Sequence, residues 1–415
     1  MAHTSARLIK VTGFAAGPAL VSVGNLAAVP ILMSVLGPAN WLPIAVGQAI
    51  GEVLRSVTTW GWNAVGQTRI AGKNADEQLA YYGLSLKPRL LMLGFAGGIM
   101  LVGVAITQSP YWSVVALTAA SGAIYGLGSA WFFVGRRDIR SLLVCDALPR
   151  AAAPVLGAAA TLALPVPYTF AISLIVGSMT ASALGFQRVV KHAANLRHPL
   201  DSEDWPSAIR RLCESTSDFL LTFTVALRLA LPTTVGPLAG PLHGSITAYS
   251  DKLLRWANTG LVPVAQLVQT SVGQQALANT MPRWSGVMAR IHGLGTALAI
   301  VMFFATPFIS EVLSAGALPL TATQSAPLAI TTSALFSNTV LANGYLASLG
   351  HERSGAILGL ISLAALIACI IPATLLWGSL GTLWSLASIE LATTITQSLM
   401  LRRHLQNRCQ STSSW

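Results

Sequence analysis

The chain alternates between long apolar runs and short polar connections along its length. About twelve of the runs are close to or above the ~20 residues that a helix needs to cross the hydrocarbon core of a bilayer. Gly and Pro occur inside many of them, which is common in transmembrane helices. The pattern predicts an all-α integral membrane protein. The predicted spans are 12–34, 41–65, 88–107, 112–134, 141–163, 167–187, 214–234, 242–272, 287–310, 319–347, 355–377 and 379–401.

The connections between these runs alternate in charge. Lys and Arg lie in the N-terminal segment, in every second connection and in the C-terminal tail. Since cytoplasmic connections are enriched in these residues, we expect both termini in the cytoplasm, an even number of spans, and only short segments outside. The connections without Lys or Arg are 37–40, 107–111, 164–166, 232–241, 310–318 and 378.

Composition agrees with a membrane protein. Of the 415 residues, 53% are hydrophobic and 9% are charged, and the mean hydropathy is +0.63. Soluble domains carry about 25% charged residues. The net charge of +11 follows from the basic cytoplasmic connections, so we predict no nucleic-acid partner. The segment Met1–Lys10 is a short polar start that leads directly into the first run, as expected of a retained helix.

Motifs for enzymatic or metal chemistry are missing from the sequence. Its four cysteines lie far apart, without a CxxC pair, and the seven histidines are scattered. HExxH, GxSxG and Walker patterns do not occur. We therefore expect a transporter, not an enzyme, with no cofactor and no metal site.

Charged residues occur at the centre of two apolar runs. Glu52 and Arg55 lie inside 41–65, roughly 16 to 21 Å from Trp41 at 1.5 Å per residue, which is near the middle of a bilayer if Trp41 marks its surface. Asp251, Lys252 and Arg255 repeat this pattern inside 242–272. A charge at that depth costs on the order of 2.5 to 3.5 kcal/mol, so it must face protein or a wet cavity.

The recurrence indicates an internal duplication. A second sequence similarity relates segment 134–142, between spans four and five, to segment 349–355, between spans ten and eleven. We predict two pseudo-symmetric six-helix lobes around a central cavity near the middle of the membrane. The predicted parts are an N-terminal lobe 1–190, a cytoplasmic linker 191–212, a C-terminal lobe 213–403 and a cytoplasmic tail 404–415.

Charges within the spans are predominantly positive. Asp146 and Arg150 are four residues apart and could pair on one helix face. The simplest interpretation is that such charges neutralise one another and lock helices together. The cations nevertheless outnumber the acids by one, and a buried guanidinium suits phosphate. The candidate substrate-binding cations are Arg55, Arg150, Arg228, Lys252 and Arg255, and the candidate acids for ion coupling or charge pairing are Glu52, Asp146, Asp218 and Asp251. Glu390 is a further acid expected to be buried, without an identifiable partner.

Two stretches resemble a known family. The turn Val35-Leu36-Gly37, the Glu52 helix and the segment 61–71 (GWNAVGQTRIA) are similar to the opening of bacterial O-antigen and exopolysaccharide lipid flippases of the Wzx type. The segment 131–135 (WFFVG) and Ala147-Leu148-Pro149-Arg150 are similar to that family's fourth and fifth helices. The resemblance covers roughly residues 20–155, and Ser34 stands where the family often carries Arg.

The resemblance places the chain in the multidrug/oligosaccharidyl-lipid/polysaccharide (MOP) exporter superfamily. It implies a V-shaped bundle in the bacterial cytoplasmic membrane that flips an undecaprenyl-diphosphate-linked oligosaccharide to the outer leaflet by alternating access. The implied partners are this substrate, membrane lipids and other polysaccharide assembly proteins. The arginines would contact diphosphate or acidic sugar, and Glu52, Asp146 and Asp251 would orient them or take up a proton.

Three alternatives remain open at this stage. A multidrug cation/proton antiporter of the same superfamily would need an acidic or aromatic cavity. A membrane-embedded glycan polymerase or ligase would need a large external loop with catalytic Arg or His. A non-transporting scaffold would gain nothing from charges at the membrane centre.

Overall fold

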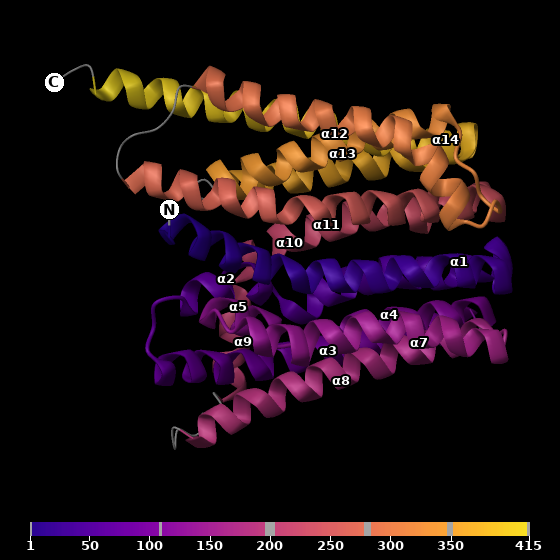
Figure 1. Ribbon diagram of the computed structural model, residues 1–415, viewed down its shortest axis with the longest axis horizontal. Helices are drawn as coiled ribbons and strands as arrows, with labels where there is room; N and C mark the ends of the chain where they lie inside the picture. The colour runs from indigo at the N-terminus through magenta and orange to yellow at the C-terminus, as the bar shows by residue number, and fades with distance from the viewer. Residues whose placement is uncertain (1, 108–109, 196–203, 278–283, 347–351, 413–415) are drawn as a thin grey trace. The chain divides into compact units, whose positions relative to one another are not determined.

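The computed structural model describes residues 2–107, 110–195, 204–277, 284–346 and 352–412, and every element in these ranges is helical (Figure 1). The α-helices are α1 (Ala2–Thr59), α2 (Trp62–Ile70), α3 (Ala75–Thr107), α4 (Pro110–Tyr125), α5 (Ala130–Arg136), α6 (Ile139–Ser141), α7 (Leu148–Ala163), α8 (Pro167–Asn195), α9 (Trp205–Glu214), α10 (Thr216–Val235), α11 (Pro241–Leu277), α12 (Trp284–Leu313), α13 (Ala322–Thr339) and α14 (Glu352–Thr412). Shorter helical turns are the π-helical η1 (Leu142–Ala147) and η3 (Val340–Leu346) and the 3₁₀ turn η2 (Gly236–Ala239).

Eight helical stretches of the described chain are long and apolar enough to cross a membrane. Two of them, in α1 and α14, are interrupted by a non-helical glycine, Gly37 or Gly378, inside a connection that the sequence predicts. α11 and α13 with η3 cover the remaining predicted spans. The predicted all-α membrane fold is therefore confirmed. The eight stretches are Ala16–Thr59, Ala75–Ile106, Pro110–Arg136, Ile139–Ala163, Pro167–Ala193, Thr216–Ala239, Gly286–Leu313 and Arg353–Arg403.

Contacts between helices divide the chain into two compact units. The first unit is Met1–Thr234 with Leu313–Ala317, and the second is Val235–Val312 with Leu318–Trp415. Each unit is described below by itself. The lobe boundaries predicted at 190 and 213 stay a prediction.

In the first unit, small residues bring helices into backbone contact. α1 turns back at Gly37, and its two arms pack mainly on α7 and α4 (Figure 1). A Cβ added to Gly24 would lie 2.9 Å from the Cα of Ala151, and one added to Gly122 would lie 2.6 Å from the Cα of Gly51. Such close approach allows the dispersion contacts that hold helices together in lipid, where no hydrophobic force acts between them.

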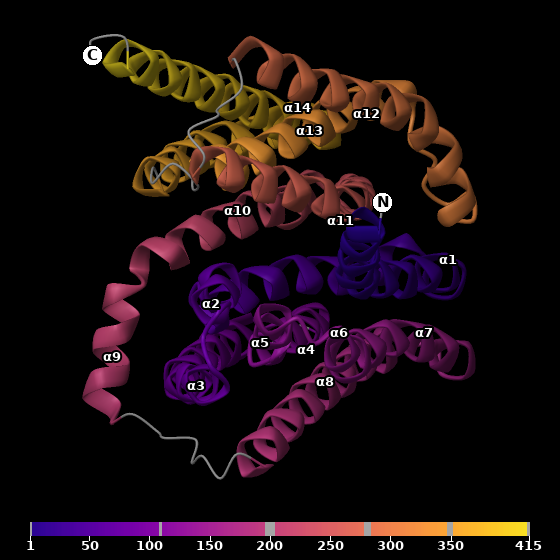
Figure 2. The ribbon, with the colours of Figure 1, turned by 60° about the vertical axis from the view of Figure 1, so that its left-hand side comes forward.

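Aromatic residues form a packed cluster at one end of the first unit. It joins α2, α3 and α5 around Trp62, Tyr82, Trp131 and Phe132, all of which are buried. The rings of Trp131 stack on Tyr82 and meet Phe132 edge-on. α9 lies beside α3 near this end and leads into α10 (Figure 2). The cluster holds α2 and α5 in fixed positions, because tightly packed rings have few alternative arrangements.

In the second unit, α14 is a helical hairpin. The hydroxyls of Thr374 and Thr382 are 2.7 Å apart, and those of Ser362 and Thr393 are 2.8 Å apart. Both pairs are nearly symmetric about Gly378, whose φ of +59° is the left-handed conformation that glycine adopts readily. The two arms therefore run antiparallel and contact each other through hydroxyl groups.

Candidate functional site

Three helices of the first unit bring predicted charged residues together around Tyr125, at the last residue of α4. Glu52 and Arg55 come from the second arm of α1. Asp146 comes from η1, and Arg150 comes from the first turn of α7. All four charged groups lie close enough to Tyr125 to interact with it electrostatically. We call these five residues the Tyr125 cluster.

The two arginines of the Tyr125 cluster contact the tyrosine ring. The guanidinium carbon of Arg150 lies 3.4 Å from the ring centroid, and that of Arg55 lies 5.4 Å from it. Nη1 of Arg150 also donates to the Tyr125 hydroxyl at 2.6 Å. A cation over an aromatic face is stabilised by the ring quadrupole. Tyr125 thus holds the two guanidiniums near each other without neutralising them.

Each arginine of the cluster also has an acid partner. Nη2 of Arg55 lies 2.7 Å from Oε2 of Glu52, and Nη1 of Arg150 lies 3.4 Å from Oδ2 of Asp146. The side chains of Arg55 and Arg150 remain 34% and 21% exposed. Both arginines are therefore paired with an acid and remain partly exposed.

Asp146 lies in an irregular turn. The π-helical turn η1 inserts an extra residue per turn just before α7, and such turns are frequent at functional sites. Asp146 is buried, and its Oδ1 has no hydrogen-bond partner in the described structure.

The second unit holds the repeated charge pattern on α11. Nε of Arg255 lies 2.9 and 2.8 Å from the two carboxylate oxygens of Asp251. Asp251 is buried, whereas the Arg255 side chain is 22% exposed. Lys252 is partly exposed on the same helix. In each unit, the repeated sequence pattern therefore forms an ion pair between an acid and an arginine on one face of a helix.

The other two predicted residues lie on α10 and do not join the Tyr125 cluster. Arg228 is buried in the middle of α10. Asp218, in the first turn of α10, accepts from Nη2 of Arg69 on α2 at 3.1 Å. Asp218 therefore ties α10 to α2 at the end of the unit.

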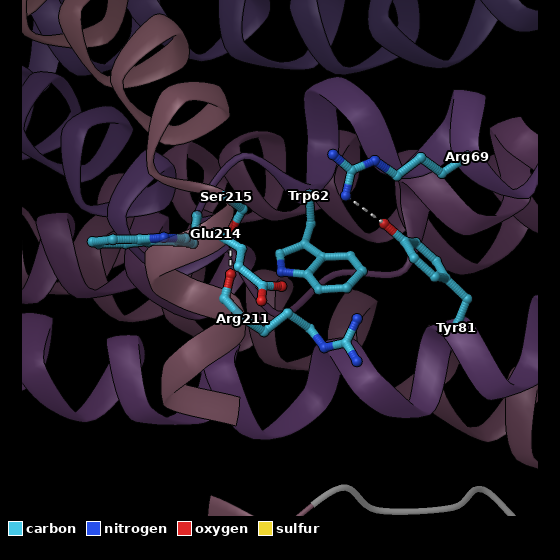
Figure 3. Close-up of a pocket in the computed structure, with 7 residues that line it drawn as sticks. Trp62, Arg69, Tyr81, Arg211, Glu214 and Ser215 are labelled. Atoms are coloured by element: carbon cyan, nitrogen blue, oxygen red, sulfur yellow. Dashed lines mark hydrogen bonds between the residues drawn. The ribbon is translucent and has the colours of Figure 1, made fainter. Parts of the chain in front are cut away.

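A pocket of about 240 Å³ lies at that end of the first unit. Its walls come from the ends of α1, α2 and α3 and from the junction of α9 with α10 (Figure 3). Sequence analysis did not predict this pocket, because its residues lie up to 155 positions apart and carry no motif. They are Trp60, Trp62, Arg69, Tyr81, Arg211, Glu214 and Ser215.

Two buried charged residues have partners that the sequence analysis did not identify. Arg89, at the start of the predicted span 88–107, is fully buried in α3 and donates to the carbonyls of Gly126 and Gly128 at 2.6 to 3.1 Å. Glu390 is fully buried in α14, and Nδ2 of Asn338 on α13 donates to its Oε2 at 2.7 Å.

Comparison with known proteins identifies the fold. No protein-family model matches the sequence, and no curated protein matches it. Among solved structures, an inward-facing multidrug resistance MATE family transporter of the MOP superfamily is similar with a TM-score of 0.63 at 13% identity, over 96% of this chain and 98% of that chain. The Vibrio cholerae MATE transporter VcmN is similar with a TM-score of 0.58 at 11% identity, over 98% and 99% of the two chains.

A third similar structure differs in its pocket. It is a MOP superfamily transporter from Pyrococcus furiosus, described as having a binding pocket of reverse polarity, with a TM-score of 0.52 at 10% identity over 96% and 95% of the two chains. These three neighbours are transporters. At such identities the likeness shows the fold: the chain is a multi-pass membrane protein with the fold of MOP superfamily transporters.

Proposed function

We propose that the chain is an alternating-access transporter that flips an undecaprenyl-diphosphate-linked oligosaccharide from the cytoplasmic to the outer leaflet of a bacterial cytoplasmic membrane, with both termini in the cytoplasm. The fold that it shares with MATE transporters supports transport. The observation that carries the choice of an anionic substrate is the placement of Arg55 and Arg150 on one tyrosine, both partly exposed.

Proton uptake and anion binding would be coupled in this cluster. With both acids ionised, the two arginines and two acids carry no net charge. Protonation of Glu52 or Asp146 would release a guanidinium from its partner and leave a net positive charge. Guanidinium groups bind phosphate oxygens through two parallel hydrogen bonds, so a protonated cluster would favour the diphosphate of the substrate.

The acid–arginine pair of the second unit would play a matching part. Asp251 and Arg255 repeat the local arrangement of Glu52 and Arg55 on their own helix. We therefore assign Arg255 and Lys252 to substrate contact, with Asp251 as the acid that orients Arg255, and Arg228 as a further cation.

The test is analysis of lipid-linked saccharides in the host after deletion of the gene. Accumulation of the undecaprenyl-linked unit on the cytoplasmic leaflet, restored by the wild-type gene and not by Arg55→Ala or Arg150→Ala, is the expected result. The matched control is Arg140→Ala, which removes an exposed arginine outside the cluster and should restore export. A normal lipid pool in the deletion strain would refute the proposal.

The second candidate is a multidrug cation/proton antiporter. Two similar structures favour it: a multidrug resistance MATE family transporter and the Vibrio cholerae MATE transporter VcmN. The acids Glu52 and Asp146 could bind an organic cation beside Tyr125 if the arginines moved away. The deletion strain would then show a normal lipid pool and a lower resistance to cationic drugs.

A further inference from the structure

We propose that the pocket at the end of the first unit binds a glycosyl phosphate, as the loading site for the headgroup of the substrate before it reaches the Tyr125 cluster. The proposal rests on the proposed function and adds to it a binding site and the chemistry of the ligand. The pocket lies on basic segments that the charge pattern places in the cytoplasm, which is the side where the substrate is made available.

Two arginines give the pocket its preference for phosphate. Arg69 is half exposed, and its guanidinium is held in place by Asp218 at 3.1 Å and by the Tyr81 hydroxyl at 3.4 Å. In Figure 3 the guanidinium of Arg211 lies below the indole of Trp62, and the guanidinium of Arg69 lies above it. A guanidinium fork can contact two oxygens of a phosphate group, so each arginine offers the phosphate of a ligand a partner.

Aromatic rings give the pocket flat apolar faces beside the arginines. Trp60 stacks on Phe219 with ring centroids 3.9 Å apart, and its indole N–H donates to the Leu212 carbonyl at 2.8 Å. Trp62 is packed against Tyr81, with centroids 4.9 Å apart. A sugar ring presents apolar C–H faces that rest on such surfaces. The arginines would therefore bind the phosphate of a ligand, and the neighbouring aromatic rings would bind its sugar ring.

Strain in the backbone holds Trp60 in position. Its φ is +44°, and that of the following Gly61 is +81°. Left-handed conformations are uncommon for residues other than glycine, and they occur preferentially at functional sites. Here the conformation ends α1 and turns the Trp60 side chain toward α9 and α10, where it becomes a wall of the pocket.

Polar groups of the α9–α10 junction complete the site. The carboxylate of Glu214 is exposed and pairs with Nε of Arg210 at 3.0 Å. The hydroxyl of Ser215 donates to the Arg211 carbonyl at 2.8 Å, which leaves its oxygen able to accept. Both groups can accept hydrogen bonds from sugar hydroxyls.

The size of the pocket limits the ligand to one ring and its phosphate. At about 240 Å³ it is smaller than the ~300 to 1,000 Å³ of pockets that enclose drug-sized ligands. A whole oligosaccharide would therefore extend out of it. The site is suited to the reducing-end sugar and the phosphate attached to it, which every glycan of this class has.

The experiment measures binding to the purified full-length protein in detergent by isothermal titration. The probes are glucose 1-phosphate, galactose 1-phosphate and N-acetylglucosamine 1-phosphate, with inorganic phosphate and methyl glucoside as the two halves of the ligand. We expect at least one glycosyl phosphate to bind tenfold or more tightly than either half. Arg211→Gln should weaken this binding at least tenfold, whereas Arg140→Gln, which removes an exposed arginine outside the pocket lining, should leave it within twofold.

Three results would overturn the proposal: no glycosyl phosphate binds, inorganic phosphate binds as tightly as the best of them, or Arg211→Gln binds as well as the wild type. Size-exclusion profiles establish that the variants fold. Should Arg211→Gln fail to fold, Arg211→Lys, which keeps the charge and loses the fork, should still bind at least threefold more weakly, and unchanged binding would count against the site.

Complementation separates this proposal from the flippase itself. In the deletion strain, Arg211→Gln should export less saccharide than Arg140→Gln. If Arg211→Gln restores full export while Arg55→Ala does not, the loading site is wrong and the flippase proposal stands. If the deletion strain has a normal lipid pool, the flippase proposal is wrong, and the titration alone decides whether the pocket binds glycosyl phosphates.

Discussion

Gly122 of α4 lies so close to Gly51 of α1 that substitution by Ala should separate the two helices. The added Cβ would overlap the Gly51 carbonyl oxygen and lie 2.6 Å from its Cα. The neighbouring atoms are backbone, so they cannot rotate away. Overpacking of this kind costs about 1 to 3 kcal/mol. Replacing Gly by Ala within a helix returns up to about 1 kcal/mol through helix propensity. With the full propensity gain, the expected net loss for Gly122→Ala is up to about 2 kcal/mol in the free energy of unfolding, and the variant should be about 1 to 3 kcal/mol less stable than a Gly→Ala variant at an uncrowded helix position.

The assay is equilibrium unfolding of the purified protein in mixed micelles of increasing SDS content. Gly98→Ala on α3 is the matched control, since a Cβ at Gly98 would meet nothing within 4 Å. It should leave the stability unchanged or raise it by up to about 1 kcal/mol. Equal stability of Gly122→Ala and Gly98→Ala would refute the close contact between α1 and α4, and with it the packing that places Glu52 and Arg55 beside Tyr125.

Three further predictions concern single side chains. Tyr125→Phe keeps the ring beside both guanidiniums but removes the hydroxyl that accepts from Arg150 at 2.6 Å, so it should cost about 1 to 2 kcal/mol in the same unfolding assay and reduce export. Tyr125→Leu, which also removes the cation–π contacts, should reduce export further, and equal export by the two variants would contradict a role for the ring. Arg89→Met leaves the carbonyls of Gly126 and Gly128 without their buried donor and should cost at least about 2 kcal/mol, whereas the exposed Arg140→Ala should stay within about 0.5 kcal/mol of the wild type; a cost for Arg89→Met as small as that of Arg140→Ala would show that the buried fork is dispensable. Asp138 caps α6: burial alone would raise the pKa of its carboxyl, but hydrogen bonds from Ser141 and the charges of Arg188 and Arg136 outweigh burial and hold the pKa below its ordinary value. The stabilising effect of Asp138 should therefore be complete above the ordinary carboxyl pKa of about 3.9 and be lost as the pH falls through the lower pKa of the folded state. The difference of about 1 kcal/mol in unfolding free energy between wild type and Asp138→Ala should thus disappear only below about pH 4. A difference that is constant down to pH 2 would contradict this.

Features set by neighbours along the chain could be predicted from the sequence. The spans follow from runs of apolar residues, because a helix in lipid must satisfy its backbone internally and present apolar side chains outward. The breaks at Gly37 and Gly378 fall in predicted connections. The pairs Asp146–Arg150 and Asp251–Arg255 follow from a spacing of four residues, which places two side chains on one helix face.

Features set by contacts between distant segments could not be predicted in this way. Tyr125 comes from a different helix than its charged neighbours, and nothing in its local sequence marks it as their partner. Arg69 and Asp218 are 149 residues apart. Arg89 follows Lys87 and Pro88 in a polar stretch that resembles a loop, although the carbonyls at the end of α4 bury it. Trp41, which the sequence suggested as a marker of the membrane surface, is only 1% exposed and packs inside the first unit.

The most direct test of the central claim is the distribution of the undecaprenyl-linked saccharide between the two leaflets in cells that lack the gene and carry either wild type, Arg55→Ala, Arg150→Ala or the control Arg140→Ala. Periplasmic access of a glycan-modifying enzyme or lectin to the lipid-linked unit reports the outer-leaflet fraction. Wild type and Arg140→Ala should place the saccharide on the outer leaflet, and the two cluster variants should leave it on the cytoplasmic leaflet. Outer-leaflet saccharide at wild-type levels in both cluster variants would contradict the role given to these arginines.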